Sequence, residues 1–213
     1  MSHSQSATIP WAWIKAARDI VRAEPRQQPT SMPVELLPWL YLSDMPSVLK
    51  VERLQALGIT AVLTTNKIVR QEDLWNMTAK LAEHDIAHGY AGGVDIVGYQ
   101  MIKYHWLEAA EFIEESLQND GKDPKIVIHC AAGTNRSALM AGAAMLLFRN
   151  TDEGDDHLTF LDVIRILKQR RGFVLNNVWF IRQLAEFAQT HNKLGPKPDG
   201  YSNEPLRQTE MVF

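Results

Sequence analysis

The segment from residue 126 to residue 147 most constrains the fold of this chain, because it predicts a strand, a tight loop and a helix in succession. The β-branched run 126–128 (IVI) is typical of a buried strand, and the run 137–147 is typical of a helix. Between them, residues 129–137 read HCAAGTNRS and hold the only cysteine of the 213 residues. A loop at this place directs backbone N–H groups and the positive end of a helix dipole at one point. We therefore expect an anion-binding loop there.

Strand-like and helix-like runs alternate over the rest of the chain, without an internal repeat. This alternation favours an α/β fold, with a central, mostly parallel, twisted sheet flanked by helices. The expected strands are residues 34–36, 40–42, 59–64, 86–90 and 126–128. The expected helices are residues 11–23, 51–57, 72–83, 101–117, 137–147, 158–170 and 178–189.

Three parts of the chain differ in composition. Residues 1–33 form an N-terminal extension, in which Pro10 precedes an amphipathic helix and a Pro-rich linker follows it. We interpret this helix as packed on the core; a helix that binds a membrane surface or a partner is the alternative. Residues 34–190 carry the regular elements of the main domain, and residues 191–213 are a polar C-terminal tail.

The composition excludes several classes of protein. The net charge is −3, so nothing indicates general attraction to nucleic acid or to a membrane. A single cysteine excludes an internal disulfide framework and a cysteine-rich metal site, and the seven histidines show no zinc-binding spacing. We expect no metal and no cofactor. No apolar run approaches the ~20 residues of a membrane span, and no signal peptide is evident, so the expected location is cytoplasmic, possibly nuclear.

The loop carries the chemical groups that are required for a nucleophilic attack on a phosphate ester. Cys130 alone would be interpreted as a buried core residue, but Gly133, Arg136 and Ser137 beside it favour a nucleophile. Arg136 can bind two phosphate oxygens, and Ser137 can donate its hydroxyl to the sulfur. The residues expected to bind phosphate are Ala131, Ala132, Gly133, Thr134, Asn135 and Arg136. His129 is expected to be a buried orienting residue, with direct catalysis as the alternative.

The pattern His-Cys-x5-Arg-Ser resembles the signature of the cysteine-based phosphatases, and the surrounding chain is similar to the dual-specificity phosphatase family, as a small atypical member. The similarity covers about residues 34–190. Its further matches are residues 40–43 (LYLS), 57–63 (LGITAVL) and 109–113 (AAEFI), together with Arg171, Asn177, Phe180, Gln183 and Leu184 near the end.

The resemblance implies a general acid on a loop some thirty-odd residues before the cysteine. Asp95 lies 35 residues before Cys130, in the glycine-rich segment 91–98, which we expect to be a mobile loop. Asp85 lies at a turn further upstream. We therefore expect Asp95 to protonate the leaving group and then to activate water, and Asn177 to support the site.

The chain departs from the family pattern at three places. Asn135 stands where the family has Ser or Gly, and the Asn135–Arg136 pair resembles RNA 5′-triphosphatases, which differ from this chain elsewhere in the loop. Gly172 and Asn176 stand where the family prefers Pro. The loop contains no Lys, which makes an inositol lipid a less favoured substrate.

The resemblance implies a protein phosphatase that acts on phosphotyrosine and phosphoserine or phosphothreonine through a phosphocysteine intermediate. Its partner would be a phosphorylated protein. One alternative is an RNA 5′-triphosphatase, or a phosphatase for another non-protein substrate, and only this alternative would involve nucleic acid. The other alternative is a phospho-binding module with little turnover.

Overall fold

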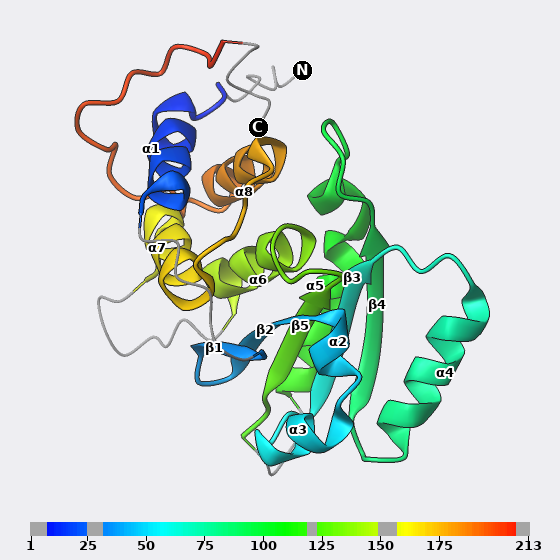
Figure 1. The fold of residues 1–213 in the computed structure, drawn as a ribbon. Coiled ribbons are helices and arrows are strands. Elements are labelled where there is room, and N and C mark those ends of the chain that lie inside the picture. Colours follow the sequence, from blue (N-terminus) through cyan, green and yellow to red (C-terminus); the bar gives the residue numbers. More distant parts are fainter. Residues whose placement is uncertain (1–7, 25–31, 119–122, 149–156, 208–213) are drawn as a thin grey trace, which may run out of the picture.

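The computed structural model describes residues 8–24, 32–118, 123–148 and 157–207. Its centre is a five-stranded sheet with the strand order β1-β2-β5-β3-β4 (Figure 1). The strands are β1 (Val34–Leu37), β2 (Leu40–Asp44), β3 (Ala61–Asn66), β4 (Ala87–Gly93) and β5 (Ile126–Cys130). Only β1 runs antiparallel to its neighbour, which confirms the expected mostly parallel α/β sheet.

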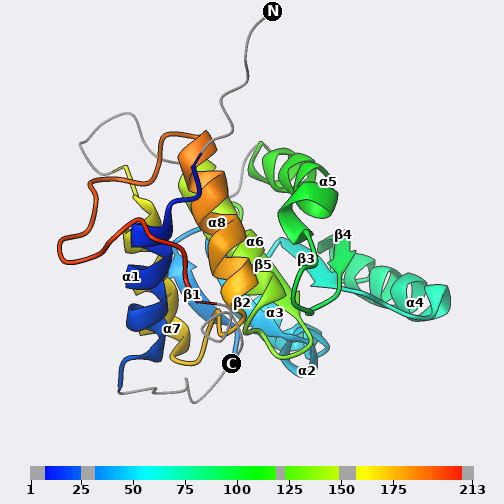
Figure 2. The same ribbon diagram turned by 90° about the horizontal axis from the view of Figure 1, so that it is seen from above.

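Helices cover both faces of this sheet. They are α1 (Trp11–Arg22), α2 (Met45–Val48), α3 (Val51–Ala56), α4 (Gln71–Ala82), α5 (Met101–Leu117), α6 (Arg136–Leu147), α7 (Phe160–Arg171) and α8 (Val178–Thr190). On one face α5 and α6 pack on the strands, and α1, α7 and α8 lie beyond and beside α6 (Figure 2). On the other face lie α3 and α4. In the part of the chain that the structure describes, no helix has the length and apolar character to cross a membrane.

The alternation of side chains along β5 explains why residues 126–128 are all apolar. Ile126 and Ile128 belong to the hydrophobic cluster shared with α5 to α8, whereas Val127 belongs to the cluster on the side of α3 and α4. Because both faces of a parallel sheet are covered, a central strand carries apolar residues on both sides. The same alternation places Cys130 on the α6 side and His129 on the α4 side.

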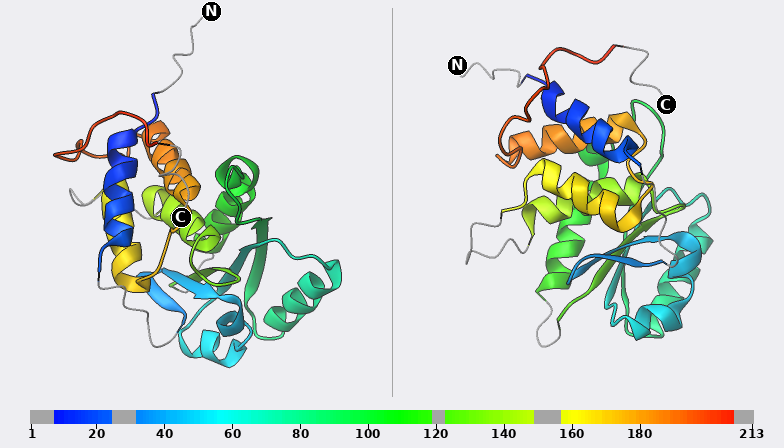
Figure 3. Two further views of the ribbon diagram at one scale, coloured as in Figure 1. Left: turned by 45° about the horizontal axis from the view of Figure 1, so that its top comes forward. Right: turned by 60° about the vertical axis from the view of Figure 1, so that its left-hand side comes forward.

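The N-terminal helix α1 packs on α7 and α8 (Figure 3), with Trp11, Ile14 and Val21 buried. Residues 201–203 then contact α1. The side chain of Asn203 accepts a hydrogen bond from the backbone of α1, and Leu206 is buried. The linker residues 25–31 and the last residues 208–213 lie outside the described part of the chain.

The glycine-rich segment 91–98 was predicted to be a loop throughout, and this is wrong for its first three residues, which belong to β4. Two glycines of this strand, Gly89 and Gly93, make room for side chains of α5. A Cβ at Gly89 would lie 2.5 Å from the ring of Phe112, and one at Gly93 would lie 2.4 Å from the sulfur of Met101. The loop itself therefore starts after Gly93 and ends where α5 begins.

Candidate active site

The loop after Cys130 lies at the edge of the sheet where the parallel strands end. Cys130 is the last residue of β5, and it stands opposite Asp44, the last residue of β2. The helix α6 begins at Arg136, one residue before the predicted start. Open α/β sheets bind their ligands at this carboxyl edge, because the loops that follow several strands meet there.

Four consecutive backbone carbonyls of the loop, those of residues 131–134, accept hydrogen bonds from outside it. The backbone N–H of Met45 donates to residue 131, and the backbone N–H of Leu175 donates to residue 134. The guanidinium of Arg171 donates to the two carbonyls between them, and the four distances are 2.9 to 3.2 Å. In a trans peptide the N–H points away from the carbonyl. The N–H groups of residues 132–135 therefore point to the opposite side, which is what an anion cradle requires.

Gly133 is required by its backbone conformation and by its surroundings. Its φ is +64°, a region that residues with a Cβ rarely adopt. A Cβ at this position would also lie 2.6 Å from the carbonyl oxygen of Ser43, on β2. The tight turn of the loop thus depends on glycine.

The sulfur of Cys130 accepts a hydrogen bond from the hydroxyl of Ser137, at 3.2 Å. Burial of this side chain, which is 1% exposed, tends to raise the thiol pKa. The hydroxyl and backbone N–H of Ser137, the charge of Arg136 and the N–H of Thr134 outweigh that effect, so the pKa of Cys130 is below its ordinary value. This environment favours a thiolate at the N-terminus of α6.

Among the described residues, the guanidinium of Arg136 is held through one nitrogen, Nη1. Its Nη1 donates to the carbonyl oxygen of Gly93, at 3.3 Å, and thereby ties α6 to the end of β4. Its Nε is buried and has no hydrogen-bond partner among the described residues. Buried donors are nearly always satisfied, so this one suits an anion bound in the loop.

Both oxygens of the Asp95 carboxylate accept hydrogen bonds from side-chain amides. Asn135 donates to one and Asn177 to the other, each at 2.9 Å, and the backbone N–H of Asn177 in turn donates to the amide oxygen of Asn135 at 3.3 Å. The structure therefore brings Asp95 to the cysteine loop. Asp85 precedes β4 and lies at the opposite edge of the sheet, where these parallel strands begin.

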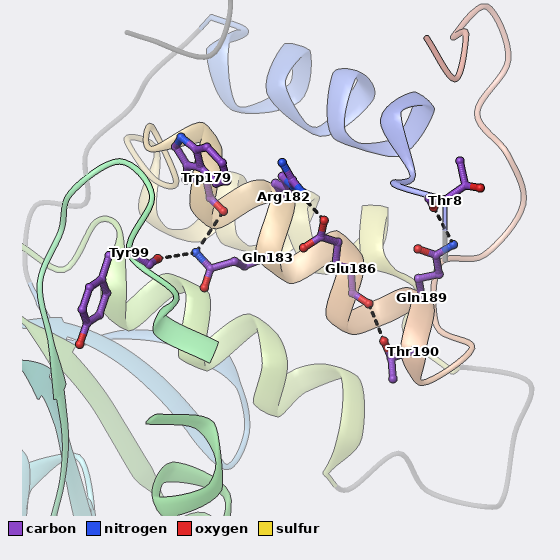
Figure 4. A network of polar contacts seen from close by, with 8 residues as sticks. All are labelled: Thr8, Tyr99, Trp179, Arg182, Gln183, Glu186, Gln189 and Thr190. Carbon is purple, nitrogen blue, oxygen red and sulfur yellow. Dashed lines mark hydrogen bonds and ion pairs between the residues drawn. The ribbon is translucent and has the colours of Figure 1, made fainter. Parts of the chain in front are cut away.

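The far end of the Asp95 loop is attached to α8 by Gln183. Its amide nitrogen donates to the carbonyl of Tyr99 at 2.8 Å, and its amide oxygen accepts from the backbone N–H of Ile102 at 3.1 Å. Figure 4 shows Gln183 between Tyr99 and Trp179, the residue that follows Asn177 by two positions. The start of α8 thus fixes both Asp95 and the end of its loop.

His129 lies below the cysteine in a chain of hydrogen bonds that leads to α4. Thr78 donates its single hydroxyl proton to the carbonyl of Leu74, so its oxygen accepts from Nδ1–H of His88, at 2.7 Å. Neutral His88 then accepts at Nε2 from Thr64, at 2.9 Å, and Thr64 accepts from Nε2–H of His129, at 2.7 Å. The network thereby assigns the proton of His129 to Nε2.

Burial keeps both imidazoles of this chain neutral. It lowers the pKa of His129 to about 4 and the pKa of His88 to about 4. His129 is 0% exposed and lies on the α4 face, away from the sulfur side of β5. This position fits a residue that orients the backbone of Cys130 rather than one that contacts a bound anion.

Sequence reasoning missed three contributions to this site. It treated Asn135 as a backbone donor only, although the side chain holds Asp95. It gave Arg171 no contact with the loop, and it did not connect Thr64 or His88 with His129. A signal was present for Thr64, a polar residue in an otherwise largely apolar strand. Arg171 gave a weaker one, since it ends a helix just before a glycine.

Comparison with known proteins places this geometry in context. Residues 40–190 match the family model described as the dual specificity phosphatase catalytic domain. Human dual specificity protein phosphatase 26 is 33% identical over 152 residues, which are 70% of this chain and 64% of that protein. Human dual specificity protein phosphatase 2 is 29% identical over 189 residues, which are 87% of this chain and 52% of that protein. The matched regions thus span less than two thirds of either relative's length.

Solved structures share the fold. The crystal structure of human DUSP28 aligns with a TM-score of 0.60 at 17% identity, over 78% of this chain and 99% of that one. The human tyrosine phosphatase-like serine/threonine/tyrosine-interacting protein aligns with a TM-score of 0.57 at 24% identity, over 75% and 97% of the two chains.

Proposed function

Because the chain belongs to the dual specificity phosphatase family, we propose that it hydrolyses phosphotyrosine and phosphoserine or phosphothreonine in proteins through a phosphocysteine intermediate. The observation that carries this proposal is the bond from Ser137 to Cys130, in a loop whose backbone and Arg136 lower the pKa of the thiol. A thiolate is the form of cysteine that attacks phosphorus.

In the first step the thiolate of Cys130 attacks the phosphorus, an S–P bond forms, and the bond between phosphorus and the ester oxygen breaks. The leaving oxygen takes its electron pair and a proton from Asp95. The N–H groups of residues 132–135 and the guanidinium of Arg136 bind the three remaining oxygens. The open Nε of Arg136 supports this role.

In the second step water attacks the phosphorus and gives a proton to Asp95, now ionised. The S–P bond breaks and its electron pair returns to sulfur. The hydroxyl of Ser137 stabilises the departing thiolate, because it already donates to that atom. Inorganic phosphate is released, and Asp95 is protonated again. The residues named here thus account for every proton transfer in the two steps.

The comparisons favour a protein phosphatase over an RNA 5′-triphosphatase. The feature that suggested RNA was the Asn135–Arg136 pair, and the contact of Asn135 with Asp95 gives that asparagine a role independent of the substrate. A binding module with little turnover is disfavoured because Cys130, Arg136 and Asp95 are all present around one loop.

We also propose a division of the chain into the extension 1–33, the catalytic domain 34–190 and the tail 191–213, with α1 and residues 201–203 in contact with each other. A lone cysteine that must stay reduced fits the cytoplasm, with the nucleus as a second compartment.

The test is to trap the intermediate. The protein is mixed with a ³²P-labelled phosphotyrosyl peptide and quenched in denaturant. We expect label on Cys130 in the native protein and none in Cys130→Ser, which should still bind vanadate or phosphate. Turnover by Cys130→Ser near the native rate would overturn the mechanism. Release of γ-phosphate from triphosphate-ended RNA faster than phosphate from phosphopeptides would instead favour the RNA substrate.

A further inference from the structure

A groove beside the cysteine loop plays no part in the chemistry described above. It lies between α2 and α4 and has a volume of about 510 Å³, within the range of ligand pockets. The residues that line it are Met45, Leu49, Asn66, Ile68, Val69, Asp73, Asn76, Met77 and Lys80.

One end of the groove adjoins the catalytic groups. Met45 lines it, and the backbone N–H of Met45 donates to the carbonyl of Ala131 in the cysteine loop, at 3.2 Å. Asn66 also lines it and ends β3. The next residue, Lys67, donates its N–H to the carbonyl of Gly93, which also accepts from Arg136. The groove therefore borders the cysteine loop, at the edge of the sheet where the parallel strands end.

The walls of the groove are mostly apolar and partly open to solvent. Leu49 is 47% exposed and Val69 is 89% exposed, on opposite sides, while Met77 is buried beneath them. At the far end Lys80 donates to the carbonyl of Leu49, at 2.9 Å, and joins α4 to the end of α2. Two exposed apolar residues that face one groove mark a surface suited to an apolar group.

The charged groups of the groove already have partners within the protein. Lys80 binds the carbonyl of Leu49, and Asp73 binds the guanidinium of Arg70 at 2.6 Å. An ionic ligand would have to compete with these bonds. Asn66, in contrast, is 8% exposed, and its side-chain oxygen is buried without a hydrogen-bond partner among the described residues. An apolar groove with one unsatisfied amide fits an apolar side chain on a polypeptide backbone, whose N–H groups are donors.

We propose that this groove binds an apolar side chain of the substrate polypeptide, close in sequence to the phosphorylated residue, and so selects among phosphoproteins. The proposal rests on the phosphatase activity proposed above, because the substrate must reach the groove from the cysteine loop. The position of the groove directly beside that loop is the reason for assigning it to the substrate rather than to a separate partner.

The experiment compares two substrates on one pair of variants. One substrate is a phosphotyrosyl peptide library with Leu or Gly at each of the four positions on either side of the phosphotyrosine; the other is p-nitrophenyl phosphate, which is too small to reach the groove. The variant is Leu49→Ser combined with Val69→Ser, two exposed positions outside the catalytic groups. The matched control is Leu107→Ser, which is 68% exposed on α5 in the native protein.

We expect the native protein and the Leu107→Ser control to prefer Leu over Gly by about tenfold in kcat/KM at one or two positions, the effect of burying one apolar side chain. The groove variant should lose that preference and keep its kcat/KM for p-nitrophenyl phosphate. Equal rates on Leu and Gly peptides in the native protein, or a preference that survives in the variant, would overturn the proposal.

Other outcomes separate this proposal from its premise. If neither substrate is turned over, the phosphatase function itself fails. If the groove variant loses activity on p-nitrophenyl phosphate as well, the groove supports the catalytic loop and does not select substrates. Sedimentation of the native protein and the groove variant at several concentrations tests whether a second copy of the chain occupies the groove. A dimer that forms in the native protein and is lost in the groove variant would also contradict the assignment.

Discussion

Asn135 donates a hydrogen bond of 2.9 Å from its side-chain amide to a carboxylate oxygen of Asp95, 40 residues earlier in the chain. This contact joins the cysteine loop to the loop of the proposed general acid. The side-chain amide of Asn177, at the start of α8, donates a hydrogen bond to the other oxygen. Three segments that are distant in sequence thereby fix the direction of one carboxyl group.

Asn135→Ser keeps a backbone donor at the position but removes the amide, so Asp95 keeps only the bond from Asn177. We expect kcat for phosphoserine peptides to fall about tenfold, because a loosely held acid protonates a poor leaving group less well. For p-nitrophenyl phosphate, whose leaving group needs little protonation, kcat should change less than threefold. Similar losses on both substrates would indicate damage to the phosphate loop instead.

Substitution of the acid itself should give a larger effect of the same kind. Asp95→Asn cannot transfer a proton, and we expect a loss of roughly 100-fold or more on alkyl phosphates, with a smaller loss on aryl phosphates. Asp85→Asn, at the opposite edge of the sheet, is the matched control and should retain native rates. Steady-state kinetics on the two substrates measures the difference, and a loss confined to Asp85→Asn would move the acid to that residue.

The state of the thiol can be measured directly. The pKa of Cys130 is lowered, so the thiolate and its alkylation by iodoacetate should appear at a lower pH than for an ordinary cysteine. Ser137→Ala removes a donor to the sulfur, and the midpoint of alkylation against pH should therefore move upward. We also expect phosphocysteine to accumulate in this variant, because the departing thiolate loses its hydroxyl partner. An unchanged midpoint would argue that the hydroxyl does not stabilise the thiolate.

The histidine chain predicts how stability depends on pH. His129 and His88 have pKa values of about 4 in the folded protein and near 6.5 when unfolded, so the unfolded chain binds more protons between these values. Stability should be fully present above pH 6.5 and fall as the pH drops toward 4, by about 1.4 kcal/mol per pH unit for each histidine.

Urea unfolding of the native protein and His88→Gln at several pH values measures this slope. The variant should have the shallower decline, since it lacks one of the two groups that take up a proton. Parallel declines in the two proteins would show that His88 does not remain neutral in the folded state.

Much of the site could be predicted from sequence because its parts are adjacent. Cys130, Arg136 and Ser137 lie within eight residues, and a strand followed by a glycine-containing loop and a helix has few possible geometries. The mostly parallel sheet followed from the alternation of strand and helix patterns. The error at residues 91–93 arose because glycine permits turns and also makes room for neighbours, and the sequence does not distinguish these two uses.

What the sequence determined by itself is local: a nucleophile, its hydroxyl donor and an arginine in one anion loop, within an α/β chain. The tertiary structure decided which distant groups serve that loop. The amide of Asn135 could be assigned to Asp95, and His88 to His129 through Thr64, only once the strands were placed in register. The groove between α2 and α4 likewise exists only in the folded chain. The physical reason is that hydrogen bonds and pockets depend on separation in space, and folding brings residues together across tens of sequence positions.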